Sequence, residues 1–192
     1  MNAQHVEARA NRMIKNALTL AESGEDERAV SMLEAVPRMY PDSAAKFRAQ
    51  LELGRHFLDK RVFDRSTIEL RAAQKSQEDD VVAEALLLQG QLHNTRGQSG
   101  EAMMVLRRLT QDYPTSPFSN DAYFLIGQIH FDAHRWTRAS EAFQMVGTAV
   151  PEQNTNETVL AEAGQRVFVH VKDKDLSCAM STFTAGGSAV IW

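Results

Sequence analysis

The chain of 192 residues has little cysteine and no long apolar run. Its single cysteine, Cys178, cannot form an intrachain disulfide, which excludes the framework of a small disulfide-stabilised domain. No apolar stretch approaches the roughly 20 residues that a membrane-spanning helix needs. Residues 1–5 show no apolar segment of a secretory signal. The sequence therefore predicts a chain that does not cross a membrane.

The chain also lacks an excess of positive charge, since its formal net charge is −4 at pH 7. Its lysines and arginines are interspersed with acidic residues, whereas proteins that bind nucleic acid normally gather a basic face for the phosphates. We therefore expect no nucleic-acid partner. A content of 43% hydrophobic and 24% charged residues is typical of a folded globular protein and not of a disordered one.

What the chain does contain is an internal repeat, because four stretches align at successive offsets of 37, 36 and 37 residues. Each stretch carries a small residue, then a second small residue, then a large apolar residue, and three of the four end on proline. These columns are Ala17, Gly54, Gly90 and Gly127; Ala29, Ser66, Ala102 and Ala139; Leu33, Leu70, Leu106 and Phe143; and Pro41, Glu78, Pro114 and Pro151. A repeat of this length and pattern indicates stacked helix–turn–helix units.

The expected fold is all-α, an α-α superhelix of about four such repeats. Within each stretch apolar residues recur at steps of three and four, which is the helical period. Short polar turns at 23–25, 59–61, 96–98 and 134–135 separate the first helix of each repeat, the A helix, from the second, the B helix. The predicted helical array covers 1–165, with repeats over about 10–43, 44–80, 81–116 and 117–153 and a partial fifth helix over 157–165.

Two columns have a direct physical reading. The prolines at 41 and 114 should end a B helix, because the residue before proline is driven out of α geometry, and Ser43 and Ser116 are placed to cap the next A helix. A glycine inside a helix costs about 1 kcal/mol relative to alanine. Three glycines at one phase therefore predict a close approach of the B helix to the A helix of the same repeat.

The character of the sequence changes after residue 165. Residues 166–192 are rich in β-branched and alternating apolar residues, which predicts a β-strand tail. Two-stranded pieces are marginal alone, so we interpret the tail as the start of a β-domain. The alternatives are a strand that pairs with the array or with a second copy of the chain, and a helix that continues through residue 171.

The columns resemble those of tetratricopeptide repeats over about residues 10–155. The period is longer than usual in that family, and the aromatic positions of the A helices are only partly filled, by Phe57 and Tyr123. The long period and the Tyr-Pro-x-Ser junctions at 40–43 and 113–116 resemble a narrower group of bacterial envelope proteins. That group includes the repeat lipoprotein of the β-barrel assembly machinery and the periplasmic coordinator of envelope constriction.

This resemblance implies a non-catalytic scaffold for protein–protein interaction with a protein or peptide partner. It also implies a periplasmic or envelope-associated location, with the cytoplasm as the alternative. A second reading of the same array is a rigid spacer that presents a C-terminal β-domain or mediates self-association.

In repeat superhelices the A helices line the concave surface, which would hold the partner segment. Helical steps along that side give a set with polar ends and apolar centres, suited to an extended peptide. The predicted binding residues are Arg48, Arg55, Glu84, Leu87, Gln91, Asn94, Asp121, Phe124, Gln128 and Phe131. The alternative is that Leu51, Leu87 and Phe124 pack between neighbouring A helices, and that Arg55, Gln91, Asn94 and Gln128 are idle solvated positions.

No catalytic residues, cofactor or metal site are expected. His93 and His130 share one column, and a stacked pair of histidines can act as a proton switch or a metal site. His130 and His134 have the four-residue spacing of helical metal ligands, but a third ligand is not evident. The simpler interpretation is that the histidines fill the aromatic slot of the repeat.

Overall fold

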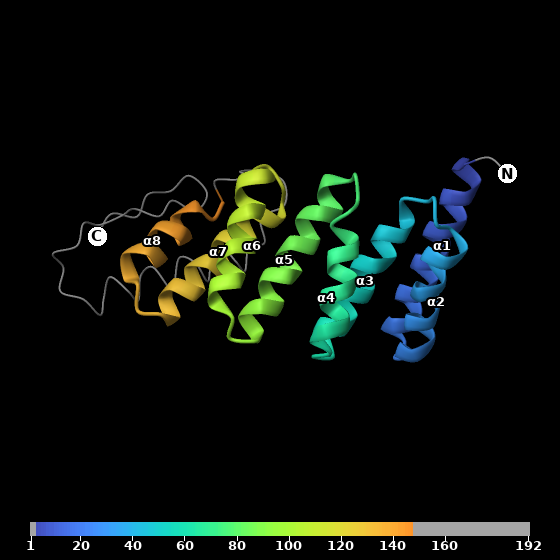
Figure 1. Cartoon of the computed structure of the whole chain (residues 1–192), viewed down its shortest axis with the longest axis horizontal. Helices are drawn as coiled ribbons and strands as arrows, with labels where there is room; N and C mark the ends of the chain where they lie inside the picture. The colour runs from blue at the N-terminus through green and yellow to red at the C-terminus, as the bar shows by residue number, and fades with distance from the viewer. Residues whose placement is uncertain (1–2, 148–192) are drawn as a thin grey trace. The chain divides into compact units, whose positions relative to one another are not determined.

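A computed structural model describes residues 3–147, which form eight α-helices and no strand (Figure 1). The A helices are α1 (Ala3–Glu22), α3 (Ala45–Asp59), α5 (Asp79–Thr95) and α7 (Phe118–Asp132). The B helices are α2 (Asp26–Met39), α4 (Phe63–Ala73), α6 (Ser99–Asp112) and α8 (Trp136–Met145). The all-α prediction is confirmed for these residues. The predicted helix over 157–165 and the β-rich tail over 166–192 lie outside the described residues.

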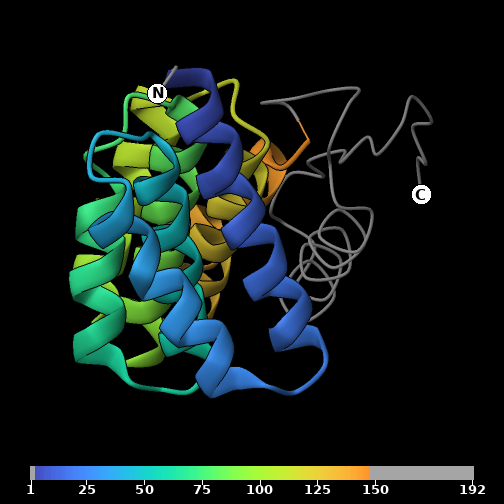
Figure 2. The ribbon, with the colours of Figure 1, turned by 90° about the vertical axis from the view of Figure 1, so that its right-hand side faces the viewer.

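The chain divides into two compact units between Leu92 and His93, within α5. In the first unit α1 packs on α2 and α3 packs on α4, and α2 also contacts α3. Figure 2 shows α1 and α2, in blue, running side by side. In the second unit α7 packs on α8 and contacts α6. Within each unit, helices therefore pack on the partner helix of their own repeat, and α1, α2 and α6 also contact the next repeat, the arrangement that gives repeat arrays their stability.

Two apolar clusters form the core of the first unit. One lies among α1, α2 and α3 and includes Ile14, Leu33 and Leu53 together with the buried alanines 10, 17, 45 and 49. The other lies among α3, α4 and α5 and includes Leu70 and Leu88. The alanines let the helices approach closely, while the leucines supply most of the apolar area that is removed from water.

The core of the second unit centres on Phe143 of α8, which is only 1% exposed. It packs with Phe124 of α7, at a ring-centroid distance of 5.7 Å, and with Ala139 and Val146.

Two of the repeat glycines lie where the B helix crosses the A helix. A Cβ added to Gly54 would sit 2.6 Å from Cδ2 of Leu70, and one added to Gly127 would overlap the ring of Phe143. Ser66 also takes part in this crossing, because its buried Oγ donates a hydrogen bond to the carbonyl of Gly54 at 2.7 Å. The predicted close approach is confirmed at both glycines.

The junctions between repeats follow the expected pattern. Helices α2 and α6 end at Met39 and Asp112, just before the Tyr-Pro dipeptides. The hydroxyl of Ser43 accepts the Ala45 N–H at 3.2 Å, and that of Ser116 accepts the Phe118 N–H at 3.4 Å. Both serines thus satisfy a backbone donor at the start of the next A helix.

All four A helices end in the same backbone motif. The second residue after each helix lies in the left-handed region, with φ of 82° at Gly24, 58° at Arg61, 73° at Gly97 and 57° at His134. The following N–H bonds to the carbonyl five residues back, as from Val62 to Phe57 at 2.8 Å, and the motif is therefore a Schellman cap. Arginine and histidine occupy two of these positions, although glycine adopts this conformation at much lower cost.

Candidate functional site

The predicted charged binding residues of the first unit are engaged in ion pairs within that unit. Arg48 of α3 donates to Glu78 at 3.1 and 2.6 Å and to the side-chain oxygen of Asn11 at 3.1 Å, which links α1, α3 and the start of α5. Arg55 pairs with Glu52 at 3.3 Å and with Glu84 of α5. On this face of the first unit, the charged groups therefore bridge successive A helices.

Burial affects the carboxylate of Glu52 on this face. Burial raises the pKa of Glu52 above its ordinary value, and the neighbouring Arg55 opposes that rise only in part. Hydrogen bonds and charge attraction from Glu84 and Glu52 raise the pKa of Arg55 despite its burial. The cluster is thus a compact set of charges whose members already compensate one another.

The second unit differs, because its predicted polar residues include a carboxylate without such a cation. Asp121 of α7 is partly buried, and burial alone raises the pKa of its carboxyl above the ordinary 3.8. Asn94, Gln128 and Phe131 are also partly buried. A partly desolvated carboxylate gains from any donor that reaches it, whether a cation or an N–H group.

The apolar members of the predicted set are buried. Leu87 is 5% exposed and Phe124 is 9% exposed, and Phe124 belongs to the core of the second unit. Leu51 belongs to a core cluster of the first unit. Any contact with a partner along the A helices therefore relies mainly on the polar members.

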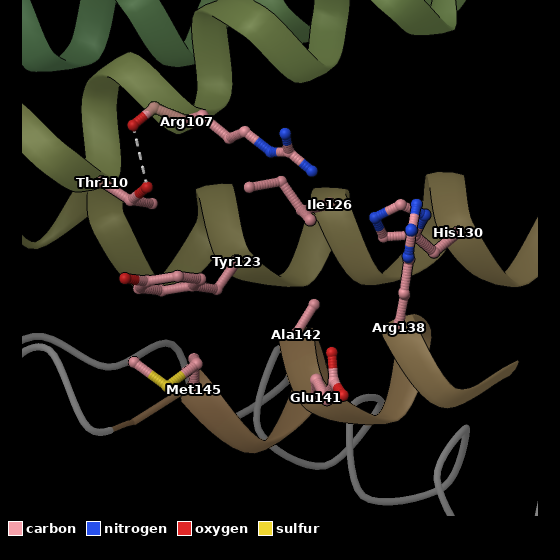
Figure 3. A pocket seen from close by; sticks show the side chains of 9 residues that line it. All are labelled: Arg107, Thr110, Tyr123, Ile126, His130, Arg138, Glu141, Ala142 and Met145. Carbon is pink, nitrogen blue, oxygen red and sulfur yellow. Dashed lines mark hydrogen bonds between the residues drawn. The ribbon is translucent and has the colours of Figure 1, made fainter. Parts of the chain in front are cut away.

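A pocket of about 540 Å³ opens on the B-helix side of the second unit (Figure 3). Its lining comes from α6, α7 and α8. Tyr123, Ile126 and Met145 give it an apolar part, while Arg107 and Arg138 give it a cationic part. In Figure 3 both guanidinium groups extend from their helices towards His130.

His130 lies at the cationic part of this pocket and is 4% exposed. Its Nδ1 is buried and has no hydrogen-bond partner among residues 3–147. Burial lowers the pKa of the imidazole, and Arg135, Arg107 and Arg138 lower it further, while Glu141 opposes them. The sum favours a neutral imidazole surrounded by positive charge.

The first unit has a related pocket of about 350 Å³, lined by residues of α2 together with His56 and Arg65. Here Arg65 pairs with Glu34 at 2.6 Å and lies over the ring of Phe57 at 4.2 Å from its centroid. The positively charged side chain of α4 is thus matched by a carboxylate from α2.

The histidines do not assemble a metal site within residues 3–147, where no group of three potential ligands comes together. His93 Nδ1 lies 2.9 Å from the side-chain oxygen of Gln98, and the ring of His134 packs edge-on against Trp136 at 5.1 Å.

The pocket of the second unit was not predicted from the sequence. Its arginines and Tyr123 come from three helices and look like ordinary exposed positions of a helical array. One signal was present, because Arg107 and Arg138 follow Glu34 and Arg65 by the same 73 residues. Aligning charges as well as apolar columns would have identified the pair.

Residues 84–116 match the family described as Tetratricopeptide repeat. Two solved structures with the same architecture are those of MamA, with a TM-score of 0.64 and 16% identity, and of PilF from Pseudomonas aeruginosa, with 0.65 and 20%. The chain is tetratricopeptide-repeat-like. The MamA match covers 87% of this chain and 83% of MamA, and the PilF match covers 88% and 74%.

A third similar structure is that of YrrB, described as a tetratricopeptide-repeat protein with an unusual peptide-binding site. Its TM-score is 0.57 at 16% identity, over 86% of this tetratricopeptide-repeat-like chain and 78% of YrrB. Identities this low establish the fold alone. A comparison with curated proteins found no match. Within the described part of the chain, no helix is both long and apolar enough to span a membrane.

Proposed function

We propose that the chain is a non-catalytic scaffold that binds an extended protein segment along its A helices. The fold supports this, because tetratricopeptide-repeat proteins generally act as scaffolds, and the similar protein YrrB is described as binding peptides. The partner would be a protein and not a nucleic acid, given the net charge of −4.

The observation that carries the proposal is the state of Asp121. Its carboxylate is partly desolvated on the A-helix side of the second unit, and no cation of the described residues lowers its pKa. Backbone N–H groups or a cationic side chain of a bound segment would supply the missing donors. Gln128 of α7 adds an amide to the same predicted set, and Phe131 adds a ring. Asn94 and Phe124 remain members of the proposed face in the second unit, and Leu87 and Gln91 remain members in the first.

A peptide-display selection against the intact chain tests the proposal. Peptides recovered with the wild-type chain should bind the Asp121→Asn variant at least about tenfold more weakly, since a charge-assisted contact is replaced by a neutral one. The matched control is Asp132→Asn, which removes an exposed carboxylate from the same helix. Equal affinity for wild type and Asp121→Asn, with unchanged circular dichroism, would contradict the proposed face.

The first unit supports a second candidate function, that of a rigid spacer. There Arg48, Arg55 and Glu84 are engaged by the chain itself, so they stiffen the array before any partner arrives. A spacer predicts that neutralising Arg48 changes the protection of α1 and α3 against hydrogen exchange and leaves peptide binding intact. A binding face predicts loss of affinity in the same variant.

We further propose an envelope-associated assembly as the setting, by analogy with the envelope proteins whose long repeat and Tyr-Pro-x-Ser junctions this chain resembles. Self-association through residues 166–192 stays part of that proposal. Fractionation of cells that express the chain at its native level tests the location, and light scattering of the intact chain tests its oligomeric state.

A further inference from the structure

Three positions of the B-helix side recur at an interval of 73 residues but change their chemistry. In the first unit they are Glu34, Phe57 and Arg65, and in the second they are Arg107, His130 and Arg138. The first unit joins its carboxylate to its arginine at 2.6 Å above the aromatic ring. The second unit has arginine at the positions of both Glu34 and Arg65, and it has histidine at the position of Phe57.

The cationic part of the second pocket lacks the carboxylate that completes the first. No carboxylate of residues 3–147 forms an ion pair with Arg107 or Arg138. Glu141 lies on the lining but pairs with neither guanidinium. The buried Nδ1 of His130 adds an unmatched polar atom at the same place. The lining thus holds two arginines against the single carboxylate of Glu141, and an incoming anion would relieve the excess of positive charge.

The apolar part of the pocket limits what that anion can be. Tyr123, Ile126 and Met145 offer a surface for an apolar group next to the cationic part. The planar guanidinium groups match a carboxylate in two-point contacts. Glu141 in the lining disfavours a group with two negative charges, so a monoanion attached to an apolar side chain fits the lining best.

We propose that this pocket binds the carboxylate of an acidic residue in a partner peptide, with an adjacent apolar side chain against Tyr123, Ile126 and Met145. The incoming carboxylate takes the part that Glu34 plays in the first unit. The site is built on α6, α8 and one side of α7, and it shares no residue with the proposed face along the A helices. One site can therefore fail while the other holds.

The test is an NMR titration of the intact chain with the blocked peptide acetyl-Leu-Glu-Leu-amide, followed through the ring nitrogens of His130. The neutral peptide acetyl-Leu-Gln-Leu-amide is the ligand control. We expect the acidic peptide to shift the His130 signals and to bind about tenfold or more tightly than the neutral one. His93 serves as an internal reference, because its ring already bonds to Gln98.

Three variants test whether the acidic peptide binds at Arg107 and Arg138. Arg107→Glu restores the charge pattern of the first unit, so it should pair with Arg138 and abolish binding of the acidic peptide. Arg138→Gln should weaken that binding about tenfold without closing the site. Arg108→Gln is the matched control, since Arg108 lies on the same helix and pairs with Asp112 at 3.3 Å outside the pocket. If Arg107→Glu fails to fold, His130→Phe copies Phe57 and supplies an alternative variant, read through shifts of Tyr123.

The proposal is overturned if the two peptides bind equally, or if Arg108→Gln weakens binding as much as Arg138→Gln. It is also overturned if inorganic phosphate binds more tightly than the acidic peptide and displaces it, because the pocket would then be a phosphate site. Binding that survives in Asp121→Asn but disappears in Arg107→Glu separates this site from the proposed A-helix face.

Discussion

Gly127 illustrates how a single residue sets the spacing of two helices. The ring of Phe143 fills the place of its missing side chain, and Phe143 is 1% exposed, so the ring has little room to move. We predict that Gly127→Ala destabilises the chain by about 1–3 kcal/mol, because overpacking outweighs the gain in helix propensity. Chemical denaturation followed by circular dichroism measures this.

The matched control for that variant is Gly100→Ala in α6, where an added Cβ meets no atom within 4 Å. Here the helix propensity of alanine acts alone and should raise stability by up to about 1 kcal/mol. Changes of the same sign in both variants would mean that close approach does not explain the glycine column.

Arg61 tests the cost of the left-handed corner. Its φ is 58°, and a side chain in this conformation costs about 1 kcal/mol relative to glycine. We predict that Arg61→Gly stabilises the chain by about 0.5–1 kcal/mol, and that Gly97→Ala destabilises it by a similar amount. Thermal melts measure both. A lower melting temperature for Arg61→Gly would show that the contacts of the arginine side chain stabilise the fold by more than the left-handed backbone conformation costs.

Asp121 tests the effect of burial on a carboxylate. Burial raises the pKa of Asp121 in the folded chain above its unfolded value, so its contribution to stability is present at low pH and is lost as pH rises through the folded pKa. We therefore predict that Asp121→Asn is more stable than wild type at pH 7, and that the gain shrinks towards zero below pH 3.8. Melts across this range measure it, and an equal pH dependence in both chains would contradict it.

At the scale of helices, the ion pair between Arg55 of α3 and Glu84 of α5 tests how much such contacts contribute to the stability of neighbouring repeats. The side chains of Arg55 and Glu84 are 39% and 21% exposed, so water screens much of their attraction. We predict a coupling free energy of less than about 1 kcal/mol in a double-mutant cycle with Arg55→Gln and Glu84→Gln. A coupling of several kcal/mol would assign the pair to the core of the array and remove Arg55 from the partner-binding set.

The helices could be predicted from the sequence, while much of the chemistry on them could not. The three- and four-residue apolar period and the proline junctions set the ends of α2 and α6 closely, since both signals act locally along the chain. The left-handed conformation of Arg61 could not be predicted from the sequence, because an arginine does not indicate a positive φ. The second pocket was missed because Arg107, Tyr123 and Arg138 come together only when three helices pack.

At the scale of the whole chain, the two compact units should respond separately to damage. Repeat arrays are stabilised mainly by neighbouring repeats, so a local defect is felt most by the helices next to it. We predict that Gly54→Ala lowers hydrogen-exchange protection in α3 and α4 much more than in α7 and α8. Exchange measured by mass spectrometry resolves this difference. An equal loss in all four helices would indicate a single cooperative unit.

The number of repeats followed from the columns, but the division of the chain within α5 did not. That division depends on how many contacts each helix makes, which no column records. The predicted tail of 166–192 also illustrates a limit of local patterns. Alternating β-branched residues favour a strand, yet a strand needs a neighbour, and the sequence does not name one.

The Schellman caps have a consequence for how this scaffold can be altered. Each corner is closed by main-chain bonds, such as the one from Arg135 to the carbonyl of His130 at 2.8 Å, and at the corner after α3 Asp59 and Arg61 are exposed. The main-chain bonds do not require a particular side chain at Asp59, whereas the positive φ at Arg61 favours glycine. An exposed corner position such as Asp59 is therefore a place where a dye, an affinity tag or a grafted loop can be attached without touching the packed interior.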